Sequence, residues 1–332
     1  MSWSGMKDAT PEPSAERKAS ADKCAQANDT PLVSVVIACY NSARYLAETL
    51  NSVAKQTHPR VEVIVVDDGS TDATAKIAHS YPVTYLHQEN QGVSAARNTG
   101  LLHCRGEYIQ FLDHDDRLLP EAIETGVRLL EQHPEAAMAV GEHRYIAIDG
   151  TTLGYSNKHA VKRDHYLELL KHNFIEAPCS VLHRRSTLTD KDLFDTTVQG
   201  AEDYELYLRI ARQHQMILHE TVVAEYRLHD DSFSHNAERT MLATNRVLQM
   251  ERPYLGECRR KIHHLDMGWL FARRLYGRRL TRELIRNGWG SLPEAQRKRE
   301  VLRRYYPLGF AAVAVSRLVP ARLLNQLSLS SL

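Results

Sequence analysis

From Pro31 onward, short apolar runs alternate with amphipathic segments along the chain. Residues 32–40 (LVSVVIACY) and 61–66 (VEVIVV) are unbroken runs rich in β-branched side chains, which is typical of strands covered on both faces. Residues 43–56, between them, carry leucine and valine at helical intervals. Further elements are expected as a strand within 83–89, a helix within 91–104 and a strand over 108–112. The alternation predicts an α/β fold with a mainly parallel sheet flanked by helices.

The pattern changes at both ends of this region. Residues 1–30 are polar, contain prolines and have no apolar core, so they predict a disordered leader rather than a signal peptide or a membrane anchor. Beyond about residue 236 the strand patterns stop and long helical stretches follow. We therefore expect an α/β domain over residues 31–235 and an appended helical unit over residues 236–332.

The net charge of +1 hides a basic C-terminal segment. From Glu251 to the end there are 17 Lys and Arg against 6 Asp and Glu, a local charge of +11. Such helices form either a solvated bundle, with a core that includes Leu265, Trp269 and Leu270, or a peripheral contact with an anionic membrane surface. No reader motif for nucleic acid accompanies the charge, so a nucleic-acid partner is not expected.

The cysteines and the terminal apolar run bear on location. The five cysteines are scattered and odd in number, so neither a disulfide framework nor a structural zinc site is expected. A reducing, cytoplasmic location fits best, with the inner face of the membrane as the alternative. The last apolar run is interrupted by Arg317 and Pro320 and is too short to span a bilayer.

A cluster of carboxylates follows the last of the predicted strands. The stretch GEYIQFLDHDD runs from alternating apolar residues into Asp113, Asp115 and Asp116. Carboxylates at close quarters repel one another unless a cation neutralises them. Asp67 and Asp68 also follow a buried run, and in parallel sheets ligands bind beyond such strand ends. Oxygen-rich sites of this kind suit Mg²⁺ or Mn²⁺ shared with the phosphates of a nucleotide.

The same residues have plain structural alternatives. The acids before Gly69 could simply make a turn, because Asp hydrogen-bonds its own backbone. The later acids could cap a helix that begins at Pro120. No glycine-rich phosphate loop follows a predicted strand, so phosphate charge would fall to the cation and to Arg97 or a later basic residue. Arg97 could instead pair with Glu89 or Glu107.

Six motifs, taken in order, resemble those of the inverting glycosyltransferases of family 2, which have the GT-A fold. They are VSVVIACYN (33–41), VIVVDDGSTD (63–72), GVSAARNTG (92–100), FLDHDD (111–116), AED (201–203) and YRLHDDSFS (226–234). Each alone is a weak signal, but together they cover most of the α/β domain. The resemblance implies a GT-A catalytic domain over residues 31–235.

On the donor side, the resemblance implies that Asp68 binds the uracil edge of a uridine nucleotide. It implies that Tyr40 stacks near the base and that the backbone of Ala38 contributes hydrogen bonds. Asp113 and Asp115 match the D-x-D pair, in which the second carboxylate, Asp115, is the implied ligand of Mn²⁺ or Mg²⁺. Asp113 is thereby placed on the donor side.

Two later residues extend this set. Arg227 and His229 match a motif that contacts the donor diphosphate or the metal in some relatives. We therefore expect Arg227, together with Arg97, to bind the donor, and His229 to join Asp115 at the metal.

On the acceptor side, Asp203 matches the general base, and a positioned carboxylate lowers the barrier for a weakly nucleophilic hydroxyl by taking its proton. Cys179 and Ser180, in a segment over residues 177–188, and Glu202 match the acceptor side. As isolated acids at the start of a helix, Glu202 and Asp203 would also be favoured by the helix dipole alone.

The implied activity is metal-dependent transfer of a sugar, with inversion, from a nucleotide-diphosphate donor, UDP in the first instance, to a hydroxyl. The implied acceptor is a saccharide or lipid-linked saccharide in polysaccharide or glycoconjugate synthesis. Two alternatives stay open. A sugar nucleotidyltransferase would share the sheet and the cation, but it usually brings a glycine-rich loop that IACYNSARYL lacks. A non-catalytic nucleotide- or glycan-binding module would not need both the D-x-D pair and Asp203.

Overall fold

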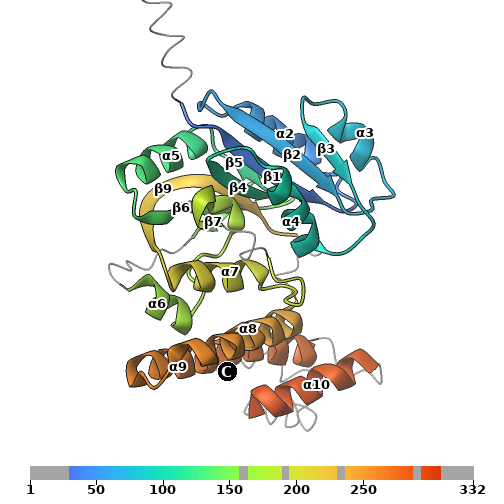
Figure 1. The fold of residues 1–332 in the computed structure, drawn as a ribbon. Helices are drawn as coiled ribbons and strands as arrows, with labels where there is room; N and C mark the ends of the chain where they lie inside the picture. The colour runs from blue at the N-terminus through green and yellow to red at the C-terminus, as the bar shows by residue number, and fades with distance from the viewer. Residues whose placement is uncertain (1–29, 157–163, 189–193, 230–235, 287–292, 308–332) are drawn as a thin grey trace, which may run out of the picture.

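The computed structural model describes residues 30–156, 164–188, 194–229, 236–286 and 293–307. Within them, a nine-stranded mixed sheet has the order β3-β2-β1-β4-β8-β6-β9-β5, with β7 paired to β6. Helices cover both faces of this sheet, and a helical layer lies below it in Figure 1. The expected leader lies almost entirely outside the described residues, as does most of the terminal apolar run.

The strands are β1 (Val33–Cys39), β2 (Val61–Asp67), β3 (Thr84–His87), β4 (Tyr108–Asp113), β5 (Arg117–Leu118), β6 (Ala136–Ile146), β7 (Thr152–Tyr155), β8 (Val181–Arg184) and β9 (Gln215–Arg227). The helices are α2 (Leu46–Ala54), α3 (Thr74–Ala78), α4 (Val93–His103), α5 (Ala122–Gln132), α6 (His165–Lys171), α7 (Glu202–Ala211), α8 (Ala237–Glu251), α9 (Arg259–Arg286) and α10 (Pro293–Tyr305).

The sheet is parallel from β3 to β4 and mixed beyond. Val33 of β1 lies opposite Val61 of β2 on one side and Tyr108 of β4 on the other. Every residue of β1 is buried, as its unbroken apolar run predicts. β4 then pairs antiparallel with β8, next to a short 3₁₀ turn. The buried amide of Gln110 donates to the backbone oxygens of Pro178 and Cys179 in that turn, which holds β8 beside β4. The expected α/β architecture is confirmed, with antiparallel pairing added where the chain returns.

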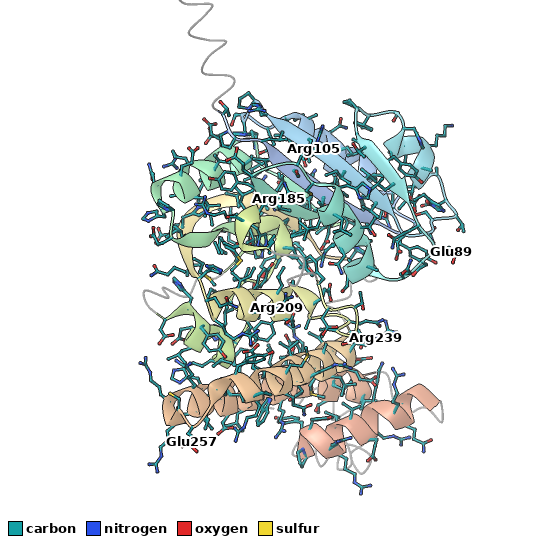
Figure 2. The ribbon with its side chains drawn as sticks, in the orientation of Figure 1. Glu89, Arg105, Arg185, Arg209, Arg239 and Glu257 are labelled. Carbon is teal, nitrogen blue, oxygen red and sulfur yellow. The ribbon has the colours of Figure 1, made fainter. Side chains whose placement is uncertain are left out.

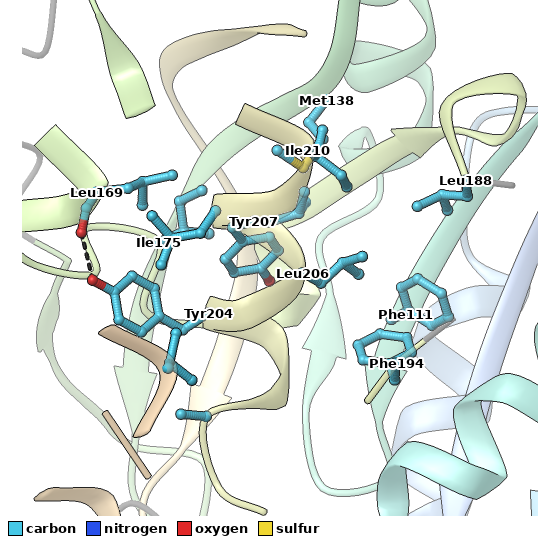
Figure 3. Packing of buried hydrophobic residues seen from close by; sticks show 14 of the residues in the cluster. Phe111, Met138, Leu169, Ile175, Leu188, Phe194, Tyr204, Leu206, Tyr207 and Ile210 are labelled. Carbon is cyan, nitrogen blue, oxygen red and sulfur yellow. Dashed lines mark hydrogen bonds between the residues drawn. The ribbon is translucent and has the colours of Figure 1, made fainter. Parts of the chain in front are cut away.

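Two apolar clusters pack on opposite faces of the sheet. Helices α2 and α5 bury Leu46, Leu50 and Ile123 on one face, as the helical spacing of residues 43–56 predicts. On the other face α4 and α7 pack on β1 and β4. Figure 3 shows this second cluster, in which the hydroxyl of Tyr204 donates to the backbone oxygen of Leu169.

The C-terminal helices contribute to this second cluster and also form a smaller one among themselves. Val247 of α8 and Leu265 of α9 belong to the second cluster. Met241, Leu280 and Leu302 belong to the smaller one. A Cβ added at Gly268 would lie 2.0 Å from the backbone oxygen of Leu170, so α9 lies directly against the end of α6. The expected helical segment after residue 236 is therefore present and is built into the α/β part.

The outer surface of α9 corrects one expectation. Leu265 is fully buried and Trp269 is partly buried, but Leu270 is 60% exposed and lies outside the core. In Figure 2, Arg105 lies at the sheet end of the molecule and Glu257 at the helical end. No helix within the described ranges is long and apolar enough to cross a membrane. Peripheral membrane contact by the C-terminal helices stays a prediction.

Candidate active site

The ends of β1 and β2 bring the expected nucleoside-binding residues together. The backbone N–H of Asp68 donates to the backbone oxygen of Cys39 at 2.8 Å, which places Asp68 next to Tyr40. The ring of Tyr40 is half exposed, whereas Ala38 is buried in the strand. These three residues therefore line one edge of the sheet, beyond which Tyr40 offers an open aromatic face.

The two neighbouring aspartates at the end of β2 have different partners. Asp67 accepts from the backbone N–H of Ser70 at 2.8 Å, so the turn expected before Gly69 is made by Asp67. Asp68 instead accepts from the backbone N–H groups of Gln91 and Gly92, at 2.9 and 2.8 Å. Its Oδ2 atom accepts one such bond, and a carboxylate oxygen can accept two. The carboxylate thus fixes the entry to α4 and keeps capacity for the edge of a base.

A buried arginine bridges the end of β4 and the start of α7. Arg97 donates to Asp113 at 2.6 Å and to Glu202 at 3.1 Å, and its side chain is only 4% exposed. Burial by itself would lower the pKa of Arg97, but these two carboxylates raise it above its usual value. Arg97 therefore does not pair with Glu89 or Glu107. Its guanidinium holds two functional segments together, and donor contact by Arg97 stays a prediction.

Asp203 occupies the first turn of α7, next to this bridge. Burial, and then the neighbouring carboxylate of Glu202, raise the pKa of Asp203 to about 7, while the positive charge of Arg97 opposes the rise. The backbone N–H of Tyr204 donates to the Asp203 carboxylate at 2.8 Å. A carboxyl group with a pKa near 7 can take up and release a proton at neutral pH, which is what a general base requires.

The expected metal residues lie in contact with each other. The Nε2 atom of His229 lies 2.7 Å from Oδ2 of Asp115, and both side chains are largely buried. Burial would raise the pKa of Asp115, but the bond with His229 and the charges of His114 and His229 lower it. No group of three or more His, Cys, Asp or Glu side chains suited to a metal occurs in the described part of the chain. One carboxylate and one imidazole fit a divalent cation that takes its remaining ligands from a diphosphate and water.

Arg227 is buried and bonded to several parts of the chain. Its side chain is 1% exposed, and its guanidinium donates to the backbone oxygens of Asp115, Ala147 and Ile148. It also donates to the carboxylate of Glu48 at 2.7 Å. These contacts hold the loop that carries Asp115, and donor contact by Arg227 stays a prediction.

Asp116 does not cap a helix at Pro120. Asp116 is buried and accepts from the backbone N–H of Arg227 at 2.9 Å. Burial, and then the charges of Asp115 and Asp113, raise its pKa well above the usual range. The next helix, α5, begins at Ala122 and has no side-chain cap. The three acids at the end of β4 thus have different partners: Asp113 pairs with Arg97, Asp115 with His229, and Asp116 with the backbone N–H of Arg227.

A cavity of about 850 Å³ opens beside Asp203. The sheet side of its lining includes Arg97, Asp113, Tyr145, Lys171, Glu176, Pro178, Glu202, Asp203 and Tyr226. The C-terminal helices contribute Thr240, Thr244, Phe271, Ala272, Leu275, Tyr276, Arg279, Arg282 and Glu283, among others. Asp113 and Asp203 thus face the same space, on the same edge of the sheet.

The residues expected on the acceptor side differ in whether they line this cavity. Glu202 lines the cavity, as expected, but Cys179 and Ser180 do not. Both are buried; Ser180 donates to the backbone oxygen of Ala177 and the Cys179 thiol lies against Asp116. Of that segment only Pro178 lines the cavity. The segment contributes to the wall through its backbone turn at Pro178, and a role for Cys179 and Ser180 on the acceptor side stays a prediction.

Sequence reasoning missed the contribution of the C-terminal helices to this site. Tyr276 and Arg279 of α9 line the cavity, opposite the Asp203 wall. No motif marks them, because they belong to a long basic helix in which many arginines look alike. The mixture of arginine and aromatic residues in that segment was the available signal.

Residues 34–195 match the family described as "Glycosyl transferase family 2". The chain is 32% identical over 254 residues to the "Putative teichuronic acid biosynthesis glycosyltransferase TuaG" of Bacillus subtilis, covering 74% of this chain and 95% of that protein. It is 31% identical over 230 residues to an uncharacterized glycosyltransferase of Rickettsia felis, covering 64% of this chain but 37% of that protein. The chain therefore spans little more than a third of the length of that longer relative. It belongs to glycosyltransferase family 2.

Solved structures show the same fold. S. aureus TarS 1–349, in complex with UDP-GlcNAc, matches with a TM-score of 0.61 and 19% identity over 86% of this chain and 87% of that chain. The mannosyltransferase PcManGT from Pyrobaculum calidifontis, in complex with GDP-Man and Mn²⁺, matches with a TM-score of 0.56 and 21% identity over 87% of each chain. Expected membership of the family and its GT-A fold are confirmed. The YRLHDDSFS motif lies outside the described residues from Asp230 onward.

Proposed function

We propose that the chain transfers a sugar, with inversion, from a nucleotide-diphosphate donor to a hydroxyl of a saccharide or lipid-linked saccharide. The observation that carries the proposal is that Asp113 and Asp203 line one cavity, in which Arg97 joins Asp113 to Glu202, the neighbour of Asp203. Asp113, at the end of β4, would then face the donor, and Asp203, in α7, would face the acceptor in the same cavity. The nucleotide sugars bound by TarS and PcManGT support such a donor, and the name of TuaG supports a role in polysaccharide synthesis.

Asp203 takes the part of general base in this proposal. As the acceptor oxygen forms its bond to the anomeric carbon, the bond from that carbon to the diphosphate oxygen breaks. The electron pair leaves with the nucleoside diphosphate, and the acceptor proton passes to Asp203. A single displacement of this kind inverts the anomeric carbon. Glu202 does not serve as the base, because its carboxylate is engaged by Arg97 and by the backbone N–H of Gly200.

The nucleoside is proposed to lie over the ends of β1 and β2, against Tyr40 and Asp68. A uridine donor is the first choice, because the Oδ2 atom of Asp68 can accept a further hydrogen bond from a base N–H. TarS was solved with UDP-GlcNAc and PcManGT with GDP-Man, so the test includes both nucleotides.

Purified protein incubated with a panel of UDP and GDP sugars, with and without Mn²⁺, tests this function. Release of nucleoside diphosphate, by hydrolysis or by transfer to an added saccharide, is the expected result. Release of pyrophosphate from a nucleoside triphosphate and a sugar phosphate would establish the nucleotidyltransferase instead. Binding of a nucleotide sugar without turnover under any condition would establish a binding module.

A divalent cation, Mn²⁺ or Mg²⁺, is proposed to be held by Asp115 and His229. When bound, it would stabilise the negative charge left on the departing diphosphate. The role of Arg227 is to hold the Asp115 loop through its bond to the backbone oxygen of Asp115 at 2.9 Å.

Asp115→Ala is expected to weaken Mn²⁺-dependent binding of UDP by about 10- to 100-fold, because the cation loses its carboxylate ligand. Calorimetric titration of UDP with and without Mn²⁺ measures the effect. Glu135→Gln, which removes an exposed carboxylate elsewhere, is the matched control and should bind as the unmodified chain does. If Asp115→Ala kept the full Mn²⁺ effect on UDP binding, Asp115 would not be a ligand.

A further inference from the structure

The cavity beside Asp203 has one wall that the proposed chemistry does not use. This wall belongs to α9 and carries Phe271, Tyr276 and Arg279. A volume of about 850 Å³ exceeds what a single reacting hydroxyl needs and suits an extended, polar small molecule. The α9 wall therefore bears on which acceptor the protein accepts, and the inference drawn from it rests on the proposed function.

Aromatic rings face the cavity from both sides. Tyr145 and Tyr226 come from β6 and β9, and Phe271 and Tyr276 come from α9. Burial raises the pKa of Tyr276; the charge of Arg279 opposes that rise, and the charges of Asp203 and Glu176 add to it. Tyr276 thus lines the same cavity as the candidate base and lies 5.9 Å from the guanidinium of Arg279, measured to the ring centre. Rings with polar tips suit sugars, which present apolar C–H faces and polar hydroxyls.

The acidic groups of the lining other than Asp203 have bonded partners. Asp113 and Glu202 are paired with Arg97, and Glu283 lies 2.5 Å from Lys298. Glu176 accepts from the hydroxyl of Tyr145.

Among the basic groups of the lining, Arg279 differs from Lys171 in its neighbours. Lys171 lies 2.7 Å from Glu168, but Arg279 is exposed and its contact within the described residues is the ring of Tyr276, at 5.9 Å from the ring centre. Arg282, one turn further along α9, also lines the cavity. The α9 wall therefore presents positive charge across the cavity from Asp203.

We propose that this cavity binds an acceptor saccharide that bears an anionic group, a phosphate or a carboxylate. The rings of Phe271 and Tyr276 hold the sugar, Arg279 holds the anion, and the reacting hydroxyl lies toward Asp203. A guanidinium binds either anion through two parallel N–H donors, so phosphate and carboxylate share one recognition chemistry. The anion binds and orients the acceptor and takes no part in bond making.

Binding of three small probes, measured by calorimetry without any donor, tests the proposal. The probes are methyl glucoside, methyl glucuronide and glucose 6-phosphate, which are neutral, carboxylate-bearing and phosphate-bearing. At least one anionic probe is expected to bind about five- to tenfold more tightly than methyl glucoside, as a partly exposed charged hydrogen bond provides. The preferred anion identifies whether the acceptor carries phosphate or carboxylate.

Arg279→Gln should remove this preference and leave the weak binding of methyl glucoside unchanged. Arg274→Gln is the matched control, because Arg274 is an exposed arginine of the same helix outside the cavity lining. Equal or absent binding of all three probes, or a preference that survives Arg279→Gln, overturns the proposal. Donor hydrolysis by Arg279→Gln, measured separately, should match that of the unmodified chain. If the unmodified chain hydrolysed no donor at all, that result would instead contradict the proposed function.

Discussion

Replacing Asp203 by asparagine is expected to lower the rate of sugar transfer by about 10³-fold while leaving donor binding nearly unchanged. The amide keeps the size of the carboxyl group but cannot accept the acceptor proton. Glu202, its neighbour, is held by Arg97 and cannot substitute for it. Transfer kinetics with a saturating nucleotide sugar, together with the Kd for UDP, measure the two effects. Glu131→Gln, at an exposed position, is the matched surface control.

The pH dependence of the reaction provides a second measurement of the same assignment. Since the pKa of Asp203 is about 7, transfer by the unmodified chain should rise with pH through 7 and then level off. About a tenth of the maximal rate is expected one pH unit below the pKa, because about a tenth of the carboxyl groups are then ionised. The residual activity of Asp203→Asn should lack this step. Equal loss of donor binding and transfer, or an unchanged pH profile, would show that another group is the base.

The same raised pKa has a consequence for stability. The pKa of a carboxyl in the unfolded chain is about 4, so between about pH 4 and 7 the folded state holds a proton on Asp203 that the unfolded state releases. Stability contributed by this group is therefore lost as the pH rises through that window. Asp203→Asn stays neutral at every pH, so at pH 8 its Tm should exceed that of the unmodified chain.

Replacing Arg97 by methionine is expected to cost about 3–5 kcal/mol of unfolding free energy, because the buried carboxylate of Glu202 and the partly buried one of Asp113 lose their shared counter-charge. Arg97 lies 2.6 Å from Asp113 and 3.1 Å from Glu202, with a side chain only 4% exposed. Arg105→Met is the matched control, since Arg105 pairs with Glu62 at 2.7 Å but is 78% exposed. An exposed pair of this kind contributes about 0–1 kcal/mol. Chemical denaturation of both variants measures the difference.

The Arg97 prediction also has an internal test. Adding Glu202→Gln to Arg97→Met removes one of the uncompensated charges, so the double variant should be more stable than Arg97→Met alone. A cost for Arg97→Met no larger than that for Arg105→Met would contradict the bridging role. Failure of the second substitution to restore any stability would place the cost in lost packing instead.

Local pattern was sufficient for the framework of the protein. The runs that became β1, β2 and β4 are mostly apolar, which is typical of strands that are covered on both faces of the sheet. The acids that follow them were located for the same reason, because parallel strands end at one edge of the sheet. Asp68 and Asp113 could thus be placed at that edge from their positions after the runs.

The partners of these residues could not be predicted in the same way. Arg97 and Glu202 are 105 residues apart, and Arg227 and Glu48 are 179 apart, so no periodic pattern connects them. A motif alone does not say which face of the loop the guanidinium of Arg227 occupies. Nor does it show that Cys179 and Ser180 are buried next to the backbone turn at Pro178, which Gln110 holds.

Only the tertiary structure shows which residues of α9 line the cavity. Its arginines follow one another along a basic helix with little to distinguish Arg274 from Arg279 in the sequence. The docking of Gly268 against the backbone of Leu170 sets the rotation of α9 and so decides which of them lines the cavity. A strand's burial follows from its own residues, whereas the content of a cavity depends on how separate elements pack, and that depends on contacts with no counterpart in the order of the chain.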